Sequence, residues 1–593
     1  MIWIHPGILA VFGAFIIPFI PFRLLKKIYF FSLPLIAFLI LILTTKGFFG
    51  EIPMTTWKIH FMGYDLILGR IDALSLFFAY VFAIIAICAN IYSLHIKNDF
   101  EHVAAMIYFG STIGAIFAGD LFTLYVFWET MAISSVFLIW FRGTSSARNA
   151  GFRYIIWHVI SGSLLLFGIA LHVQKTGSIF FTNFMDFINL GLDSIPYLLI
   201  LLGFMINAAV IPFHSWLTDS YPEASITGAT YMSAFTTKCA VYALVRGFAG
   251  LEILAWLGAV MAVYGVIFAA IVNDGRRLLS YHIVSQIGYM VCGIGLGTPL
   301  AINGAVALAF SNIIYKTLLF MGMGAVIEVT GKSKFTELGG LYRYMTLTFY
   351  LYMIGALSIF GFPLFSGFVS KPMVVYASAE LHLPLIFLLL EGAAIGTLHT
   401  VGLRLPWSVW FSREKPKDLI AKEPPKNMLV AMSITAFLCV FFGTYPGYKV
   451  FYSILPYPTD YEPYEPFKVV TTIQLFAFTT LAFLIYRKKY RNVEAIVLDT
   501  DWLGRVLGSR FVSFCETKLV DLARRIDKSS SYFAEKIKIL FTNPEMTYKS
   551  TKSNLEQSSN SPISRQLEMG IGILLTLLFM LVYLIYLILQ EIF

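Results

Sequence analysis

Residues 203–246 read GFMINAAVIPFHSWLTDSYPEASITGATYMSAFTTKCAVYALVR, and Pro212 interrupts the long apolar region in which they lie. Because proline lacks a backbone donor and clashes with the preceding turn, a helix here is expected to kink or break. Such a break is tolerated at membrane depth only where protein or a water-filled cavity covers the freed backbone groups. Asn207 precedes the break, and Lys238 lies deep in the next apolar helix, where a charge must be paired, hydrated or used. This stretch predicts one half of an ion path.

The composition of the chain is that of a membrane protein. Of its 593 residues, 58% are hydrophobic and only 13% are charged, and its mean hydropathy is +0.76. Soluble domains carry about 25% charged residues, so we expect a polytopic protein embedded in a lipid bilayer. The net charge of +9 is modest for this length, and nothing in the sequence indicates a nucleic-acid partner.

The cysteines give no sign of a redox centre. The five cysteines are scattered, without a CxxC pair or the Cys/His spacing of a zinc or iron–sulfur site. We therefore expect no cofactor, no metal and no catalytic centre in this chain. The N-terminal residues lack a basic region and a small-residue cleavage site, so we interpret them as a retained first helix.

Apolar runs of about 20 residues, the length that spans a bilayer, predict about sixteen transmembrane helices. They are expected near residues 3–21, 28–45, 72–95, 102–118, 121–140, 153–173, 195–213, 226–249, 251–272, 279–297, 300–328, 347–380, 384–411, 427–445, 468–486 and 568–592. The seventh of these is broken at Pro212 and the twelfth at Pro363. A polar outer loop is expected over residues 46–70.

Lysine and arginine residues gather in the loops that follow odd-numbered helices. These residues are Arg23, Lys26 and Lys27; Arg142, Arg148 and Arg153; Arg276 and Arg277; Lys332, Lys334 and Arg343; and Arg413, Lys415, Lys417 and Lys422. Because short cytoplasmic loops carry an excess of basic residues, these loops are predicted to be cytoplasmic and both termini to lie outside.

The two broken helices indicate an internal repeat. Pro212 and Pro363 lie in helices that are five helices apart, and a repeat unit with an odd number of helices must occur in the membrane in two opposite orientations. Inverted repeats with broken helices are typical of ion sites at the membrane midplane. We expect N-terminal transmembrane helices over 1–95, half-channels over 96–250 and 251–412, and additional transmembrane helices over 413–490.

The C-terminal part has a different character. Over residues 494–541, apolar residues recur at helical spacing opposite a charged face, as in an amphipathic helix on a membrane surface or a partner. Residues 544–565 are rich in Ser, Asn, Lys and Gln and are expected to be flexible. The predicted organisation is a cytoplasmic-side lateral helix and flexible segment over 491–565, followed by a C-terminal transmembrane helix over 566–593.

Four ionisable residues are predicted at membrane depth, namely Glu129, Lys238, Lys316 and Lys371. A carboxyl group among apolar side chains favours its neutral form unless a cation lies close, so Glu129 is a natural proton carrier. The alternative is a neutral side chain bonded to a backbone carbonyl. A buried lysine loses its proton readily and can relay it, or it pairs with a carboxylate for structure alone. We favour transport because buried charges are costly to keep without a use.

Further titratable residues accompany these four. Glu391 and His399 lie eight residues apart on one face of the helix predicted at 384–411. Histidine titrates near neutral pH, so His399 is either a proton carrier or a structural hydrogen-bonding group. The same choice is open for His214, just after Pro212, and for His282, both expected near the membrane interfaces. Together these residues predict a series of polar groups through the middle of the protein.

The sequence resembles a known family of membrane subunits. The motifs that carry the resemblance are LFTLYVFWE (121–129), PFHSWLTDSYPEA (212–224), TKCAVYALVR (237–246), RRLLSYHIVSQIGYM (276–290), YKTLLFMGMGAVI (315–327) and GFPLFSGFVSK (361–371). They are similar to the antiporter-like subunits shared by respiratory complex I, Mrp-type Na⁺/H⁺ antiporters and membrane-bound hydrogenase or sulfane reductase complexes. The stretch 396–407 is most similar to the Mrp and hydrogenase branch.

The resemblance implies an all-α polytopic fold. It would have about fourteen core transmembrane helices, with two inverted five-helix repeats that contain broken helices. A C-terminal lateral amphipathic helix and a final transmembrane helix would follow. The resemblance also implies a proton role for Glu129, Lys238, Lys316 and Lys371, and the cytoplasmic membrane of a prokaryote as the location.

Two positions depart from the family pattern. The family usually has a lysine five residues before the helix-breaking proline, and here that position is Asn207. The family often has a histidine four residues before the lysine of the eleventh helix, and here that position is Asn312. Asparagine can hold water but cannot take up a proton at physiological pH. The Glu–Lys pair of the family is therefore incomplete, unless Lys238 or His158 replaces the lysine.

Two functions remain open from the sequence. The first is a subunit that translocates protons, or exchanges Na⁺ for protons, in a multisubunit and redox-driven membrane complex. Its partners would be homologous antiporter-like subunits, small membrane subunits and a peripheral redox module. The second is a structural adaptor that holds its neighbours with the lateral helix. Asn207 and Asn312, which replace titratable residues of the family, support this second hypothesis.

Overall fold

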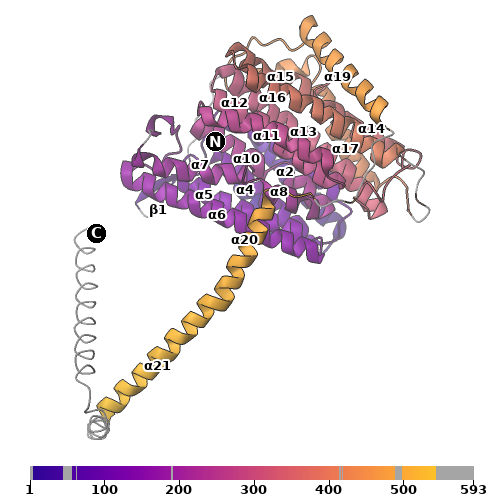
Figure 1. Ribbon diagram of the computed structural model, residues 1–593. Helices are drawn as coiled ribbons and strands as arrows, with labels where there is room; N and C mark the ends of the chain where they lie inside the picture. Colours follow the sequence, from indigo (N-terminus) through magenta and orange to yellow (C-terminus); the bar gives the residue numbers. More distant parts are fainter. Residues whose placement is uncertain are drawn as a thin grey trace. The chain divides into compact units, whose positions relative to one another are not determined.

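The structure is a computed structural model that describes residues 4–44, 57–61, 63–188, 191–412, 416, 419–487, 494 and 497–542. The chain divides into two units, Met1–Asp499 and Thr500–Phe593. The first unit is a bundle of helices with one short hairpin (Figure 1). The flexible segment predicted at 544–565 and the last span predicted at 568–592 lie outside the described residues.

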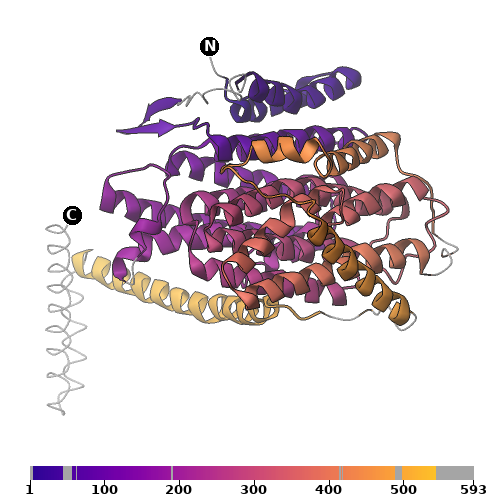
Figure 2. The same cartoon turned by 90° about the horizontal axis from the view of Figure 1, so that it is seen from above.

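The first half of the bundle contains the N-terminal helices and the first broken helix. Its helices are α1 (Pro6–Ala14), η1 (Ile17–Phe19), α2 (Arg23–Thr44), α3 (Ala73–Ser93), α4 (Asp99–Phe117), α5 (Leu121–Trp140), α6 (Ser145–Thr176), η2 (Met185–Phe187), η3 (Leu192–Ser194), α7 (Ile195–Asn207), α8 (Ser215–Ser220), η4 (Tyr221–Glu223), α9 (Ile226–Met232) and α10 (Thr236–Phe248). Within the expected outer loop, β1 (Lys58–Phe61) pairs antiparallel with β2 (Tyr64–Ile67). Figure 2 shows α1 and α2 along one side of the bundle, where they contact α4 and α3.

The second half of the bundle contains the second broken helix. Its helices are α11 (Glu252–Ile271), α12 (Gly275–Leu296), α13 (Pro299–Thr330), α14 (Thr346–Phe360), α15 (Ser366–Glu380), α16 (Pro384–Thr397), the π-helical η5 (Leu398–Arg404) and η6 (Trp407–Phe411), α17 (Lys426–Phe441), α18 (Gly447–Ser453) and α19 (Pro466–Tyr486).

The fold class predicted from the sequence is confirmed. Among the described residues, ten helices are long and apolar enough to cross a membrane, and three shorter apolar helices accompany them. The chain is therefore a mainly helical, multi-pass membrane protein. The count of fourteen core helices and the inversion of the two repeats stay predictions.

Acidic residues define where two of the core helices begin. Asp72 precedes α3 and accepts the Ser75 backbone N–H at 2.9 Å, while the Ser75 hydroxyl accepts the Asp72 N–H at 2.9 Å. Asp120 caps α5 in the same position and accepts the Thr123 N–H at 2.8 Å. Such caps satisfy N–H groups that the first turn of a helix leaves unpaired.

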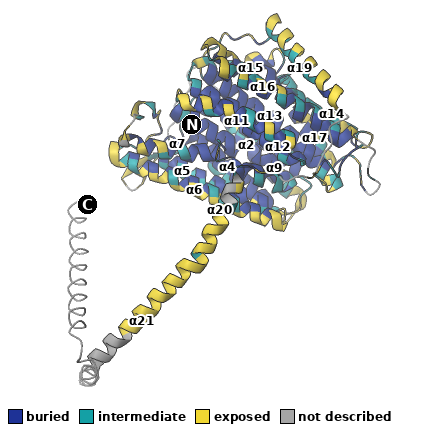
Figure 3. Cartoon of the chain, viewed as in Figure 1, coloured by how far each residue is buried: buried dark blue, intermediate teal, exposed yellow. Residues whose placement is uncertain are grey.

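The core lies around α12 and α13, whose membrane-spanning windows are wholly buried within the bundle. Helices at the periphery, such as α6 and α19, expose many apolar side chains, as expected where lipid covers them. Figure 3 shows this arrangement as a buried interior with an exposed rim. Ionisable residues on α10, α12 and α13 are therefore the furthest from lipid and water.

The structure differs from the predicted helices in three places. The span expected at 3–21 consists of α1 and η1 only. The helix expected at 226–249 is interrupted at residues 233–235, just before Lys238. The helix expected at 384–411 changes from α to π geometry at Leu398. Hydropathy reports how long an apolar segment is but not whether its helix is continuous. Because these interruptions leave the apolar length almost unchanged, hydropathy could not predict them.

The second unit contains α20 (Asp501–Phe514), the π-helical η8 (Cys515–Leu519) and α21 (Val520–Thr542). These helices lie within the stretch 494–541, where the sequence predicts an amphipathic helix, and its lateral position stays a prediction. Its described side chains are exposed almost throughout (Figure 3).

Candidate functional site

The first helix break exposes backbone groups in the interior of the bundle. Between α7 and α8, Ala209 adopts a left-handed conformation with φ 53°, which is costly for a residue with a Cβ. The Trp216 indole donates to the Ile206 carbonyl at 2.8 Å and so satisfies a group at the end of α7. Strained backbone of this kind concentrates at functional sites.

The second break has the same local feature. Between α14 and α15, Leu364 has φ 77°, directly after Pro363. The hydroxyls of Ser358 and Ser366 lie 2.8 Å apart across this break. The backbone N–H of Leu364 donates to the Tyr464 hydroxyl at 3.2 Å. Both prolines therefore break helices where the sequence predicted, and each break includes a left-handed residue other than glycine.

Glu129 lies on α5 with its carboxylate against α6. A Cβ placed on Gly162 of α6 would lie 1.8 Å from Glu129 Oε1, so the absent side chain of Gly162 makes room for the carboxylate. Oε1 is buried and has no direct hydrogen-bond partner among the described residues, although the residue as a whole is only half-buried. The carboxylate is thus held in place by packing.

His158 lies one helical turn before Gly162 on the same helix. Its ring packs against Tyr154 at 4.1 Å and Trp216 at 4.8 Å between ring centroids. It lies beside Asn207, close enough for the two side chains to interact. Within the described part of the chain, neither side chain makes a hydrogen bond of normal geometry, and both are almost completely buried. Asn207 of α7 and His158 of α6 are thus neighbours in the interior of the bundle, and His158 lies on the same helix as Gly162, which contacts Glu129.

Lys238 is completely buried on α10. Its ammonium donates to the Ser233 carbonyl at 2.7 Å, in the interruption between α9 and α10. The last carbonyls of a helix lack intrahelical partners, so the interruption supplies the acceptor. In the part of the chain that is described, Lys238 forms no ion pair with Glu129. Lys238 therefore does not replace the family's lysine as the ion-pair partner of Glu129 in the described structure.

Three further buried basic side chains follow in the second half. Lys316 on α13 donates to the Leu279 carbonyl at 3.0 Å. His282 on α12 lies 2.6 Å from the Thr400 hydroxyl through Nε2. Lys371 on α15 lies 4.5 Å above the Tyr289 ring, a cation–π contact. His282 is fully buried because α12 lies entirely within the bundle, and its expected position near a membrane interface stays a prediction.

These groups form a series of electrostatic neighbours. Lys316 lies close enough to Lys238 for the two side chains to interact electrostatically. His282 lies equally within electrostatic reach of both Lys316 and Lys371. Lys371 in turn lies within range of Glu391 on α16. The fold thus brings ionisable side chains from α10, α13, α12, α15 and α16 together as a series of neighbours.

Asn312 lies beside this series. Its amide donates to the Tyr315 hydroxyl at 3.1 Å, and that hydroxyl donates to Gln286 Oε1 at 3.1 Å. Asn312 therefore belongs to a hydrogen-bonded cluster with Tyr315 and Gln286, and none of these three side chains is an acid or base near neutral pH.

His399 occupies a different environment. It lies in η5 with its ring 5.6 Å from Phe483 and its charge neighbour is Arg404. Arg404 donates to the carbonyls of Ala269 at 3.1 Å and Val272 at 2.9 Å. His399 is not among the charge neighbours given above for Lys316, His282 and Lys371.

His214 contacts a residue that sequence reasoning did not single out. Its Nε2 lies 3.2 Å from Asp499 Oδ1, and the Asp499 side chain is only 1% exposed. The hydroxyls of Tyr264 and Tyr281 also donate to this carboxylate. Burial opposes its ionisation, but the bonds and charge of His214 and the two hydroxyls hold the pKa of Asp499 well below its usual range. The only signal in the sequence is an aspartate after a short apolar run.

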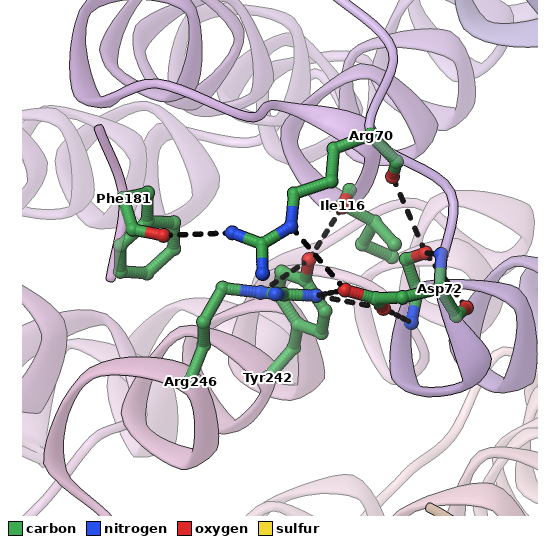
Figure 4. A network of polar contacts seen from close by, with 7 residues as sticks. Arg70, Asp72, Ile116, Phe181, Tyr242 and Arg246 are labelled. Carbon is green, nitrogen blue, oxygen red and sulfur yellow. Dashed lines mark hydrogen bonds and ion pairs between the residues drawn. The ribbon is translucent and has the colours of Figure 1, made fainter. Parts of the chain in front are cut away.

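A second network of hydrogen bonds and ion pairs lies at the C-terminal end of α10 (Figure 4). Arg246 donates to both carboxylate oxygens of Asp72, at 2.9 and 2.8 Å, and to the Tyr242 hydroxyl at 2.9 Å. Tyr242 donates in turn to the Ile116 carbonyl. Arg70 lies 3.5 Å from Asp72 and donates to the Phe181 carbonyl at 2.9 Å. This network joins α3, α4 and α10 and so fixes the helix that carries Lys238.

The bundle, its two broken helices and its buried charges define the class of antiporter-like membrane subunits. The chain belongs to the NADH:quinone oxidoreductase/Mrp antiporter transmembrane family, whose pattern matches residues 118–396. The resemblance found in the sequence is thereby confirmed.

Individual relatives extend this match. An uncharacterised protein of Methanocaldococcus jannaschii is 31% identical over 366 residues, which cover 59% of this chain and 76% of the relative. A Na⁺/H⁺ antiporter subunit of Bacillus subtilis is 26% identical over 422 residues, covering 67% of this chain and 83% of the relative. A chain of an archaeal membrane-bound sulfane sulfur reductase has the same fold. Its TM-score is 0.74 at 24% identity, and the match covers 91% of this chain and 99% of that one.

Proposed function

We propose that this chain is a proton-translocating subunit of a multisubunit membrane complex. The observation that carries this proposal is the series of buried charges from Lys238 through Lys316, His282 and Lys371 to Glu391. Buried ionisable groups are costly in a membrane and mark ion pathways. The proposed roles are relay of protons by the three lysines and entry or exit at Glu129 and Glu391, which are only half-buried.

The relatives support the setting of this function. The Bacillus subtilis relative is named as an antiporter subunit, and the sulfane sulfur reductase is described as an archaeal respiratory membrane complex. We infer that this chain likewise assembles with other membrane subunits, in the cytoplasmic membrane of a prokaryote. Exchange of Na⁺ for protons, and a peripheral redox module that drives transport, belong to the same proposal.

Ion pairs between loops support the proposed orientation. Lys26 pairs with Asp99, Arg153 with Asp219, and Lys334 with Glu494. Each pair joins loops that the basic-residue distribution predicts on the cytoplasmic side. The proposed topology therefore has the loops after odd-numbered helices and the lateral helix inside, and both termini outside.

The test is ion transport in vesicles that contain the whole complex. Glu129→Gln and Lys238→Ala are each expected to abolish transport while the complex still assembles, because each removes a group that carries a proton. Glu337→Gln and Lys175→Ala are matched controls, since both residues lie in exposed ion pairs. A pH-sensitive dye reports protons, and radioactive sodium reports Na⁺ exchange.

The second candidate is an adaptor with an interrupted path. Asn207, Asn312 and the missing ion pair between Glu129 and Lys238, all within the described residues, favour it. Unchanged transport in both variants would exclude the transport proposal and leave the adaptor, whose lateral helix would hold its neighbours.

A further inference from the structure

The series of charges has one gap, between Glu129 and Lys238. Glu129 lies against α6, whereas Lys238 on α10 donates to the Ser233 carbonyl in the interruption before that helix. Asn207 ends α7 beside His158 but cannot take up a proton. If protons pass from one residue to the other, another group must accept and release them.

We propose that His158 carries the proton across this gap, as a further residue of the transport path. This inference rests on the proposed function and adds a residue to it. His158 would take the proton of the Glu129 carboxyl group on one ring nitrogen, leaving a carboxylate and an imidazolium. The imidazolium would then release the proton from its other nitrogen toward the neutral amine of Lys238, giving an ammonium and a neutral ring. The net result is one proton moved from Glu129 to Lys238.

The position of His158 supports the first transfer. Gly162, which contacts the Glu129 carboxylate, lies four residues after His158, and residues four apart lie on one face of a helix. The histidine is therefore the next side chain along the face of α6 that the carboxylate touches. Glu129 Oε1 and both ring nitrogens of His158 are buried without a direct partner among the described residues. Buried polar atoms of this kind normally bind a group or a water molecule.

The surroundings of the ring support the second transfer. Tyr154 packs on the His158 ring, and it also lies close to Thr236, at the start of the helix that carries Lys238. The ring of His158 is therefore one side chain away from the start of α10. The hydroxyl of Thr237, which precedes Lys238, is buried without a partner in the described part of the chain and is a polar atom on the side of Lys238.

Other groups around His158 are less suited to this role. Tyr154 and Tyr221 are phenols, which titrate far above neutral pH, and Tyr154 is bonded to Ser135 at 2.7 Å. Arg153 and Asp219 are committed to an ion pair at 2.6 Å. An imidazole, by contrast, can accept a proton at one ring nitrogen and donate one from the other.

The experiment compares four variants of the complex in vesicles. His158→Gln is expected to lower the transport rate about tenfold or more, because it removes an acid–base group and keeps a polar side chain of similar size. Tyr154→Phe, which keeps the ring packing and removes only the hydroxyl, is expected to retain transport. Asn207→Lys adds a second proton carrier beside the histidine and is expected to retain transport. The double variant His158→Gln/Asn207→Lys is expected to recover it.

The outcomes separate this inference from the proposed function. Full transport in His158→Gln, in preparations where Glu129→Gln is inactive, would overturn the role of His158 and leave the proposed function intact. Activity in both Glu129→Gln and Lys238→Ala would overturn the proposed function itself. Loss of transport in Tyr154→Phe equal to that in His158→Gln would also contradict the inference, because the hydroxyl would then carry the proton. Where a lysine at position 207 prevents assembly, the comparison of His158→Gln with Tyr154→Phe decides the result.

Discussion

Packing alone positions the carboxylate of Glu129. Its Oε1 atom occupies space that a side chain on Gly162 would fill, and it has no direct hydrogen-bond partner among the described residues. Its position therefore depends on a glycine in a neighbouring helix. A carboxylate without a fixed partner can exchange its proton without first breaking a strong bond.

Gly162→Ala is expected to lower transport several-fold without removing any charge. The added Cβ would lie 1.8 Å from Oε1, and the flexible carboxylate rather than the helix would move. Alanine favours a helix over glycine by about 1 kcal/mol, so the stability of α6 should not fall. The measurement is proton transport in vesicles together with the thermal unfolding of the complex.

Gly508→Ala is the matched control, because it also lies in a helix but its Cβ would meet nothing within 4 Å. Unchanged transport in Gly162→Ala would show that proton transport does not depend on the position of the Glu129 carboxylate next to α6.

At the level of elements, the segment before α20 is tied to the first broken helix. Asp499 joins His214, at the start of α8, to Tyr264 on α11 and Tyr281 on α12. One carboxylate therefore connects the two predicted half-channels. The contact also fixes the orientation of His214, whose Nε2 faces the carboxylate.

Asp499→Ala is expected to destabilise the first unit by about 3 kcal/mol, because hydrogen bonds to a charged group each contribute about 1.5–3 kcal/mol. The readouts are the midpoint of thermal unfolding and the rate of proteolysis after residue 487. Glu494→Ala, which removes the exposed ion pair with Lys334 at 3.2 Å, is the control and should cost less than about 1 kcal/mol. Equal effects of the two variants would contradict the role of Asp499.

The stabilisation by Asp499 has a defined pH dependence. The pKa of Asp499 is lower in the folded state than its usual value of about 4, so the contribution is present above about pH 4 and is lost as the pH falls further. The difference in stability between the wild type and Asp499→Asn should therefore shrink as the pH falls below about pH 4. A difference that grew on acidification would contradict this assignment.

At the level of the whole molecule, the lateral helix presents an apolar face. Leu522, Ile526 and Phe533 lie at helical spacing along α21 and are 52%, 58% and 65% exposed. Burying two such side chains contributes about 3–6 kcal/mol. Neighbouring membrane subunits are the expected partners, in agreement with the proposed assembly.

Ile526→Glu/Phe533→Glu is expected to abolish co-purification of this chain with its neighbours, since charged groups would have to be buried at the contact. Lys528→Glu changes the charge of an exposed residue on the same helix and should leave the complex intact. The measurement is the subunit composition of the purified complex. Unchanged composition in the double variant would exclude a holding role for this face.

Several features followed from the sequence because they depend on local chemistry. Apolar length predicted α5 at its observed bounds. Pro212 and Pro363 predicted the two breaks, because a missing N–H and a ring clash act within one turn. The burial of Lys238, Lys316 and Lys371 followed from their apolar surroundings, and the structure places all three inside the bundle.

Other features depend on contacts between distant parts of the chain, and only the tertiary structure decided them. His214 and Asp499 are 285 residues apart, and no local pattern joins them. The interruption before Lys238 supplies a carbonyl to its ammonium, yet residues 233–235 contain no proline. The carboxylate of Glu129 lies against α6 only because Gly162 has no side chain there. The sequence by itself determined that Lys238, Lys316 and Lys371 are buried, because hydrophobicity acts residue by residue. Packing between helices decided which of those groups are neighbours.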